Sequence, residues 1–354
     1  MNFKMTYKSA GVDINLAKEA HKRIGRLITS TFNLRRNKFG ELLNEYGHYA
    51  ALLNISATTA LALHADGVGT KVLIAQTMDK YDTVGIDCVA MNVNDLVCCG
   101  AEPVAIVDYI ALEASNHLLA EQLMKGLVKG AKKSGAAIVG GETAIMPDVI
   151  TGVKPGSGSH LAARRAGVLA TKNIVLGDRV KPGDIVIGLP SSGFHSNGYT
   201  LIRRIIERRK IDLNSKPLSG SKTLGEILLT PTRIYVQEVL PLVENNLVTG
   251  LAHITGGAFT KLMRITKGKL GFELNMPKPP RIFTCLQEWG GVDSYEMYKT
   301  FNMGIGFCII TPSENETEVI KSCRAHGLKP IILGRVVKEP GVKLKTSSGE
   351  ELSY

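Results

Sequence analysis

The sequence predicts a two-domain fold of the α+β class. With 354 residues, the chain is too long for one ordinary hydrophobic core. Its composition is globular, with 44% hydrophobic and 21% charged residues, so the apolar material suffices for two cores. Short apolar runs that end in glycines and carboxylates alternate with amphipathic segments, which is typical of alternating strands and helices. We place the domain boundary before Gly177, giving domains of residues 1–176 and 177–354.

Charge and apolar patterning limit the classes of partner. The formal net charge of +11 invites a nucleic-acid interpretation, but the basic clusters lack interleaved aromatic residues and any nucleic-acid-binding motif. No apolar run approaches the roughly 18 residues of a membrane span, and residues 1–8 lack the apolar core of a signal peptide. The six cysteines form no Cys-x-x-Cys pair, which predicts buried, reduced thiols. We therefore expect a cytoplasmic protein with no membrane segment and no nucleic-acid partner.

Local patterns predict the elements of the first domain in order. Asp13 is a candidate N-cap for an amphipathic helix with an apolar stripe. The apolar run 87–99 predicts a buried helix that stops at Gly100. In chain order we expect a helix over 14–35, a strand ending before His64, a helix over 87–99, a buried strand over 104–111, a helix over 116–134, and strands over 136–139 and 167–175. Residues 39–53 are either a loop folding towards the site or a solvated connector.

In the second domain, a strand over 185–189 is expected to lead into the polar segment 191–199 and a helix over 199–209. Pro231 is expected in the first turn of a further helix, the position that proline favours. Residues 253–258 and 300–306 are polar, rich in glycine and next to apolar runs. They are either contacts to a second substrate or ordinary turns.

The segment 64–71, His-Ala-Asp-Gly-Val-Gly-Thr-Lys, indicates phosphate chemistry. Gly67 and Gly69 permit backbone conformations that let main-chain N–H groups approach an anion. Lys71 offers a positive charge, and Asp66 offers a ligand for the magnesium that accompanies a nucleotide. The spacing differs from that of a Walker loop. Taken alone, the segment is equally compatible with a glycine-rich turn.

Two further polar clusters stand at the ends of apolar elements. Asn94 and Asp95 lie near the end of the predicted buried helix, and Gly-Gly-Glu-Thr at 140–143 follows a short apolar strand. Alternating strand and helix folds assemble ligand sites at such ends. Asp87 lies seven residues before Asn94 and therefore on the same helix face. A carboxylate on so apolar a helix needs a partner, either a metal ion or a lysine.

Together these motifs resemble a known superfamily. They are Asp-Gly-x-Gly-Thr-Lys at 66–71, Asn-Asp-Leu-x-x-x-Gly-Ala-x-Pro at 94–103 and Gly-Gly-Glu-Thr at 140–143. The superfamily includes formylglycinamidine ribonucleotide synthetase, selenophosphate synthetase and thiamine monophosphate kinase. Over nearly its whole length the chain looks most like the phosphoribosylformylglycinamidine cyclo-ligase family, also called aminoimidazole ribonucleotide synthetase. The segments that carry this closer resemblance are Tyr7–Asp13, Gly140–Pro147, Ser191–Tyr199, Pro231–Tyr235 and Glu296–Asn302.

The resemblance implies a fold and a reaction. The fold is the two-domain α+β fold of aminoimidazole ribonucleotide synthetase, in which the N-terminal domain binds ATP and forms a barrel across a homodimer, and the C-terminal domain is α/β. The reaction is the ATP-dependent cyclisation of formylglycinamidine ribonucleotide to 5-aminoimidazole ribonucleotide, the fifth step of de novo purine biosynthesis. ATP would phosphorylate the formyl oxygen, and the iminophosphate would lose phosphate when the amidine nitrogen attacks.

The resemblance also implies roles for individual residues. The expected ATP-binding residues are Asp66, Gly67, Gly69, Thr70, Lys71, Asn94, Gly140, Gly141 and Thr143. The expected Mg²⁺ ligands are Asp66, Asp95 and Glu142, since hard oxygen atoms suit that ion. The expected contacts to the ribonucleotide substrate are Ser192, His195, Ser196, Asn197, His253, Thr255, Gly256 and Asn302. Lys71 and His195 are expected to be catalytic. Lys71 would bind the nucleotide phosphates, and His195 could transfer a proton because an imidazole titrates near neutral pH. A structural, hydrogen-bonded His195 is the alternative.

The chain departs from the family pattern in three places. The family's Gly-Gly-Phe-x-Gly loop reads Glu-Tyr-Gly-His-Tyr-Ala at 45–50, and its Asp-Leu-Ala-Gly reads His-Leu-Ala-Ala at 160–163. Ala258 stands where a third glycine is usual. These changes motivate an alternative, namely a non-catalytic nucleotide-binding regulator or another ATP-dependent phosphotransferase of the superfamily. Retention of Lys71 with all three carboxylates argues against loss of catalysis.

Overall fold

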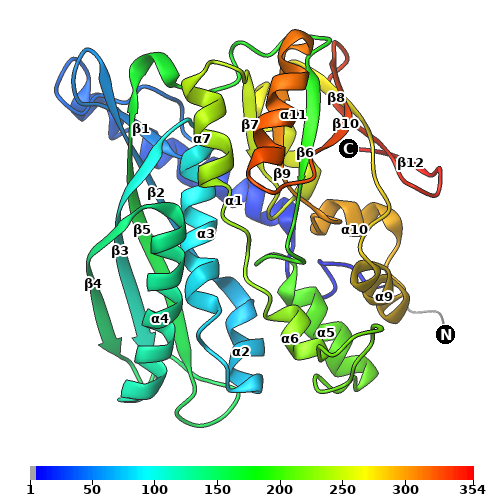
Figure 1. Cartoon of the computed structure of the whole chain (residues 1–354). Coiled ribbons are helices and arrows are strands. Elements are labelled where there is room, and N and C mark those ends of the chain that lie inside the picture. The colour runs from blue at the N-terminus through cyan, green and yellow to red at the C-terminus, as the bar shows by residue number, and fades with distance from the viewer. Residues whose placement is uncertain (1–4) are drawn as a thin grey trace.

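The computed structural model describes residues 5–354 and contains two β-sheets, one in each half of the chain (Figure 1). The first sheet has the strand order β1-β2-β5-β3-β4, and the second has the order β12-β11-β8-β10-β6-β9-β7. The strands of the first sheet are β1 (Ala51–Asn54), β2 (Thr59–Gly67), β3 (Glu102–Leu112), β4 (Ala137–Ile145) and β5 (Ser159–Ala170). Those of the second are β6 (Ile185–Pro190), β7 (Gly250–His253), β8 (Gly271–Asn275), β9 (Ile305–Thr311), β10 (Ile331–Val337), β11 (Gly341–Lys345) and β12 (Glu351–Ser353). The expected domain boundary falls in the connection between the two sheets and stays a proposal.

Helices cover one face of the first sheet and surround the second. The helices of the first half are α1 (Ile14–Thr29), α2 (Val72–Met78), α3 (Val84–Val97) and α4 (His117–Ser134). Those of the second half are α5 (Tyr199–Arg209), α6 (Leu224–Leu228), α7 (Val236–Glu244), α8 (Leu262–Ile265), α9 (Arg281–Gly290), α10 (Ser294–Thr300) and α11 (Glu316–Ala325). Figure 1 shows α3 and α4 side by side in front of the first sheet. Among the helices of residues 5–354, none has the length and apolar character that crossing a membrane requires.

Helix α3 is buried along its whole length, from Val84 to Val97. This confirms the predicted buried helix, although the helix begins three residues earlier than expected. The chain leaves it through Gly100, whose φ of +85° is the left-handed conformation that a glycine C-cap supplies. All six cysteines are buried and unpaired, as predicted.

The first sheet has an open face on the side away from α3. Its apolar side chains there are between 37% and 63% exposed, and they are Leu63, Val104, Val107, Tyr109 and Val139. Alternate residues on the other face, such as Ile106 and Ile110, are buried. The predicted buried strand over 104–111 is therefore present as β3, but the part of the chain that the structure describes covers only one of its faces. A row of exposed apolar side chains on a sheet marks an interaction surface.

Several elements follow their local signals closely. The predicted helix over 116–134 is α4, and the side chain of Asn116 accepts a hydrogen bond from the Leu119 N–H at 3.1 Å as its N-cap. The predicted helix over 199–209 is α5, and the predicted strand over 185–189 is β6. Caps and apolar periodicity lie within these segments themselves, so no distant contact is needed to recognise them.

Several predicted elements are wrong in their bounds. The strand predicted to end before His64 is β2, which runs on to Gly67. The strand predicted over 167–175 is β5, which runs from Ser159 to Ala170, because two arginines in its middle interrupt the apolar pattern. The cluster at 140–143 lies within β4 and does not follow it. The helix predicted to start at Pro231 starts at Val236. Residues 231–235 have no regular secondary structure, and the N–H groups of Thr232 and Tyr235 bind side chains of α3.

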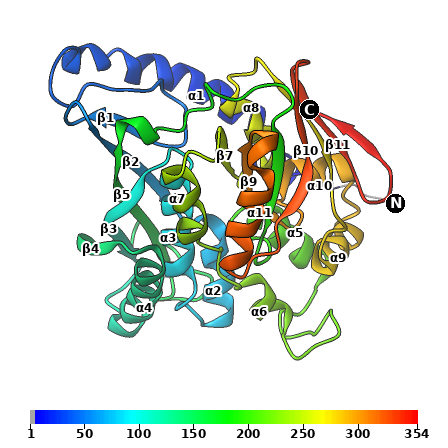
Figure 2. The same cartoon turned by 45° about the horizontal axis from the view of Figure 1, so that its top comes forward.

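The predicted amphipathic helix over 14–35 is shorter than expected, because α1 ends at Thr29 and is followed by a 3₁₀ turn over Phe32–Arg35. Its apolar stripe is exposed: Leu16, Ile24 and Leu27 all face solvent. Figure 2 shows α1 along the top of the molecule, away from the layer formed by α3 and α4. Like the open face of the first sheet, this stripe has no cover among residues 5–354.

Candidate active site

A pocket of about 450 Å³ on the first sheet brings two of the predicted clusters together. Its lining includes Asp66 and Gly67 from β2 and Gly141 and Glu142 from β4. The strand register explains this, because Asp66, Ala163, Asp108 and Gly141 pair in one row across four strands. In the next row lie Gly67, Ala162, Tyr109 and Glu142. The first and third motifs are therefore opposite rims of one pocket.

Gly141 is a glycine for a steric reason at this pocket. A Cβ added there would lie 2.3 Å from the Oδ1 atom of Asp108, well inside van der Waals contact. Asp108 is buried in the strand next to it, and burial raises the pKa of its carboxyl. Gly140 and Thr143 lie on the exposed stretch of β4 beside this position. The Gly-Gly pair thus leaves room for a carboxylate and keeps the rim of the pocket open.

The three carboxylates predicted to hold Mg²⁺ do not form one metal site. Within residues 5–354, no group of three or more His, Cys, Asp or Glu side chains is placed to hold a metal ion. Asp66 and Glu142 stand in adjacent rows whose side chains point to opposite faces, on strands separated by two others, a backbone distance of roughly 14 Å. Asp95 lies on α3, where His253 and His64 contact its two carboxylate oxygens. The predicted metal set therefore does not fit the arrangement within one chain.

Asp95 forms the centre of a second polar cluster, between the two halves of the chain. Its Oδ1 accepts a hydrogen bond from Nδ1 of His253 at 2.8 Å, and its Oδ2 lies 3.4 Å from Nε2 of His64. The amide of Asn94 lies 3.3 Å from Nε2 of His253 and also accepts the Tyr235 N–H at 2.9 Å. With Nε2 accepting from the amide, the proton of His253 sits on Nδ1 and points at Asp95.

The charges of this cluster favour an ionised Asp95. Burial alone raises the pKa of its carboxyl, but the hydrogen bond from His253 and the charges of His64 and Lys261 outweigh burial and lower that pKa to about 2. In contrast, burial raises the pKa of Asp66, and the negative charge of Asp95 adds to this rise. Burial also lowers the pKa of His253, so its imidazole is neutral at pH 7. The cluster consists of a fixed anion and a neutral imidazole with a defined tautomer.

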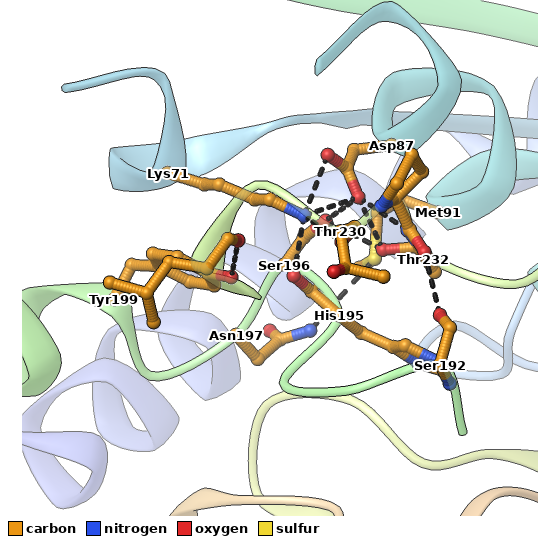
Figure 3. A network of polar contacts seen from close by, with 12 residues as sticks. Lys71, Asp87, Met91, Ser192, His195, Ser196, Asn197, Tyr199, Thr230 and Thr232 are labelled. Carbon is orange, nitrogen blue, oxygen red and sulfur yellow. Dashed lines mark hydrogen bonds and ion pairs between the residues drawn. The ribbon is translucent and has the colours of Figure 1, made fainter. Parts of the chain in front are cut away.

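Lys71 is completely buried and belongs to a third cluster (Figure 3). Its Nζ lies 2.9 and 2.8 Å from the two carboxylate oxygens of Asp87 and donates to the carbonyl oxygens of His195 and Thr230 at 3.0 and 2.7 Å. Of the two partners considered for Asp87, the lysine is the one observed. An ammonium has three donors, and protein oxygens occupy all of them. The expected role of Lys71 as a phosphate ligand therefore does not match this geometry.

His195 is also buried, with 1% of its surface exposed, and adopts a left-handed φ of +61°. Its Nε2 accepts the Ser192 N–H at 3.2 Å, while its buried Nδ1 has no hydrogen-bond partner among the described residues. Burial, followed by the charges of His253 and Lys71, holds the pKa of the imidazole well below its usual value. The expectation that His195 titrates near neutral pH is therefore wrong. The ring is neutral and carries an unused Nδ1–H donor.

The other predicted substrate contacts hold the loops of the second half together. Ser192 donates to the carbonyl of Pro231 at 2.6 Å, and Asn302 donates to that of Gly193 at 2.8 Å. Ser196 donates to Asp87 at 3.1 Å. Of the remaining substrate contacts, Asn197 lies by the sulfur of Met91, Thr255 contacts Lys261, and an ideal Cβ on Gly256 would lie 3.1 Å from Asn197. Of the predicted ATP-binding residues, Thr70 contacts Thr200 of the second half, and Gly69 has a φ of +69°. These residues thus line one junction, at which α3 meets the second half.

Two cations of this region have no clear signal in the sequence. Burial lowers the pKa of Lys261, whereas the charges of the Asp95 and Asp66 carboxylates raise it. Its Nζ stands 5.7 Å from the ring centroid of Tyr49. Arg165 is buried in β5, and none of its three guanidinium nitrogens has a hydrogen-bond partner among the described residues. Burial lowers the pKa of Arg165 to about 10, so it remains charged. Neither residue belongs to a recognisable motif, and only the packing of strands reveals them.

Comparison with known proteins first defines the class. The family model described as "AIR synthase related protein, N-terminal domain" matches residues 47–156, and its C-terminal counterpart matches residues 181–347. Among solved structures, thiamine-monophosphate kinase from Stenotrophomonas maltophilia K279a superposes with a TM-score of 0.63 at 18% identity, over 91% of this chain and 95% of that one. T. maritima PurL complexed with ATP gives a TM-score of 0.59 at 16% identity, over 92% of this chain and 48% of that one. The chain thus spans about half of the PurL chain, and these likenesses establish the fold.

Curated relatives narrow the class to one family. The phosphoribosylformylglycinamidine cyclo-ligase of Thermococcus kodakarensis is 45% identical over 342 residues, which cover 96% of this chain and 98% of the relative. The protein of the same name from Methanosarcina mazei is 48% identical over 343 residues, which cover 96% and 97%. The chain belongs to the phosphoribosylformylglycinamidine cyclo-ligase family. The resemblance inferred from the motifs is confirmed, and so is the two-domain fold class.

Proposed function

We propose that this protein catalyses the ATP-dependent cyclisation of formylglycinamidine ribonucleotide to 5-aminoimidazole ribonucleotide, with release of ADP and phosphate, in de novo purine biosynthesis in the cytoplasm. The observation that carries the proposal is the match of nearly the whole chain, at 45% and 48% identity, with relatives named for this reaction. A loss of catalysis is not favoured, since the pocket and the polar clusters of the site are all present.

The chemical problem is a poor leaving group. The formyl oxygen of the substrate is amide-like, and it does not leave its carbon readily as water or hydroxide. Transfer of the γ-phosphoryl group of ATP to that oxygen forms an iminophosphate, and attack by the amidine nitrogen then expels inorganic phosphate as the ring closes. The protein has to align two anionic substrates and exclude water, which converts a reaction between two molecules into one within a complex.

The pocket on the first sheet is the proposed nucleotide site. Its rims carry Asp66, Gly67, Gly141 and Glu142, and a related fold, PurL, has been solved with ATP bound. A magnesium ion bound with ATP would offset phosphate charge. Because the predicted carboxylates do not converge within one chain, we assign no ligand set to it and route no step through it.

The junction around His195 and His253 is the proposed ribonucleotide site. His253 is oriented by Asp95, and its neutral state suits hydrogen bonding to an uncharged formyl or amidine group. His195 contributes a neutral Nδ1–H donor that the protein leaves unused. Since a buried donor without a partner is costly, this atom is a position where a substrate oxygen would be stabilised.

The reaction has an isotopic test. With substrate carrying heavy oxygen at the formyl group, we expect one heavy oxygen in each phosphate released into unlabelled water, because the formyl oxygen must leave as part of the phosphate. Mass analysis of the phosphate measures this. Unlabelled phosphate with the label in water would mean that ATP hydrolysis and ring closure are separate, and it would overturn the proposed route. A control without ribonucleotide substrate reports any background hydrolysis of ATP.

We further propose that the protein is a homodimer joined through the open face of its first sheet. Three apolar side chains there, Leu63, Val104 and Val139, are exposed and lie outside the lining of the pocket, and the family resemblance implies a shared barrel. Leu63→Glu, on this face, is expected to convert a dimer into a monomer in sedimentation at micromolar concentration, because it buries a charge in the interface. Leu118→Glu, on the exposed side of α4, is the matched control and should leave the dimer intact. A monomeric parent protein that turns over would refute the assembly.

A further inference from the structure

The buried ion pair of Lys71 and Asp87 joins the two halves of the chain. Both side chains are 0% exposed, and both come from the first half. Lys71 ends the glycine-rich stretch that begins at Asp66, and Asp87 lies on α3. Their hydrogen bonds reach two loops of the second half, 191–197 and 230–232, as Figure 3 shows.

Asp87 holds these loops through several donors at once. Its Oδ1 accepts from the backbone N–H of Thr232 at 2.7 Å, the hydroxyl of Thr232 at 2.6 Å and the hydroxyl of Ser196 at 3.1 Å. Ser196 and Thr232 also contact each other, with 2.9 Å between their hydroxyl oxygens. A buried ion pair is weak evidence for stability, because desolvation offsets most of the attraction. A pair that also fixes two loops has a geometric effect that an apolar replacement cannot reproduce.

The pair acts on His195 through the backbone. Lys71 donates to the carbonyl oxygen of His195, whose left-handed φ of +61° is unfavourable for a residue with a Cβ and persists only where contacts impose it. In this conformation the ring turns back so that Nε2 accepts the Ser192 N–H, which leaves the proton on Nδ1. The neighbouring Ser196 is fixed by Asp87 on the other side. The loop conformation and the tautomer of His195 therefore depend on both charged residues.

We propose that Lys71 and Asp87 are a positioning pair. The pair couples the end of the glycine-rich stretch 66–71 to the loop that presents the Nδ1–H of His195 to the substrate. This inference rests on the proposed function and replaces the phosphate-ligand role of Lys71. It predicts that the pair affects turnover more than nucleotide affinity. A phosphate ligand would have the opposite signature.

The test uses variants that distinguish a loss of stability from a loss of loop positioning. Lys71→Met alone leaves a buried carboxylate without its cation, which is strongly destabilising. The double variant Lys71→Met/Asp87→Asn removes both charges and keeps an acceptor for Thr232, so its melting temperature is expected to recover most of this loss. Its kcat is nevertheless expected to be about 100-fold lower than that of the parent, because a displaced loop misaligns the reacting groups. Its Kd for ATP, measured by calorimetry, should stay within about threefold, given that no phosphate contact is lost.

The nitrogen resonances of the His195 ring give a readout that is independent of turnover. In the parent protein we expect a protonated Nδ1 and an unprotonated Nε2, and in the double variant an average of the two tautomers. Recovery of the parent kcat together with stability would overturn the proposal. A tenfold or greater loss of ATP affinity with unchanged His195 resonances would also overturn it and restore Lys71 as a phosphate ligand.

Two further variants keep the proposal testable if the double variant does not fold. Thr232→Val removes only a hydroxyl from the network at nearly constant volume, and we expect kcat to fall about tenfold with unchanged ATP affinity. An unchanged kcat would contradict the positioning role. Lys129→Met breaks an exposed pair with Asp82 at 3.1 Å and is the matched control, expected to leave kcat and Kd unchanged. If the parent itself fails to cyclise the substrate, the proposed function fails, while the His195 resonances still report on the pair.

Discussion

Replacement of Gly85 by alanine is expected to lower the free energy of unfolding by about 3 kcal/mol or more, at the upper end of what overpacking does. Gly85 lies where α3 crosses α4. A Cβ there would lie 2.3 Å from the amide nitrogen of Leu127, 2.5 Å from the carbonyl oxygen of Leu123 and 2.6 Å from the carbonyl carbon of Gly126. All three atoms are backbone, so no side-chain rotation relieves the clash, and the two helices must move apart.

Urea unfolding followed by circular dichroism measures this effect. Gly140→Ala is a suitable control, because a Cβ at that position meets no atom within 4 Å and its backbone lies outside the left-handed region. The control should unfold within about 0.5 kcal/mol of the parent, as surface substitutions do. Equal stability of the Gly85 variant and the control would mean that α3 and α4 are not held in this close contact in solution.

The elements predicted correctly are those whose signals are local. The N-cap at Asn116 and the periodicity of α4 and α5 lie within the segments that they define, and they specify the helices without reference to the rest of the chain. The start of α7 is different. Pro231 is a valid local signal for a helix start, but side chains of α3 accept hydrogen bonds from the N–H groups of Thr232 and Tyr235, and the helix starts only at Val236. A tertiary contact thus overrides the local preference.

The sequence predicted which residues belong to the candidate site, but it did not predict which of them lie together in one cluster. The motifs at 66–71 and 140–143 are expected from the sequence to contribute to one ligand site, and residues of both line one pocket. They do so because Asp66, Gly67 and 140–143 lie within strands of one sheet, whereas the sequence pattern predicts that both motifs follow strands. Which carboxylates share a face depends on strand order and register, which the sequence does not reveal. Asp66 and Glu142 fall in adjacent rows, and Asp95 falls on a helix that faces the histidines of the second half. The pairing of Lys71 with Asp87 likewise depends on the tertiary arrangement and could not be identified from the sequence alone.

Asp95→Asn is expected to lower kcat by about 100-fold or more, because the residue fixes both the tautomer and the orientation of His253. The amide keeps the shape of the carboxylate, yet its NH₂ group competes with its oxygen for the 2.8 Å contact to Nδ1. In the parent protein, the amide of Asn94 donates to the unprotonated Nε2 of His253. In the other tautomer Nε2 carries the proton, so two donors would face each other. Steady-state kinetics with saturating ATP measure the loss, and normal turnover of the variant would leave Asp95 without a role in the site.

The same substitution, Asp95→Asn, is expected to change how the free energy of unfolding depends on pH in the acid range. The folded-state pKa of Asp95, about 2, lies below the ordinary value of 3.8, so its ionised form stabilises the fold by about 2 kcal/mol at any pH above 4. That contribution is lost as the pH falls from 4 towards 2, where the carboxylate takes up a proton in the folded state as well. The difference in unfolding free energy between the parent and Asp95→Asn should therefore be constant from pH 7 to pH 5 and shrink below pH 4. A difference that stays constant down to pH 2 would show that the pKa of Asp95 owes nothing to the hydrogen bond from His253 or to the charges of His64 and Lys261.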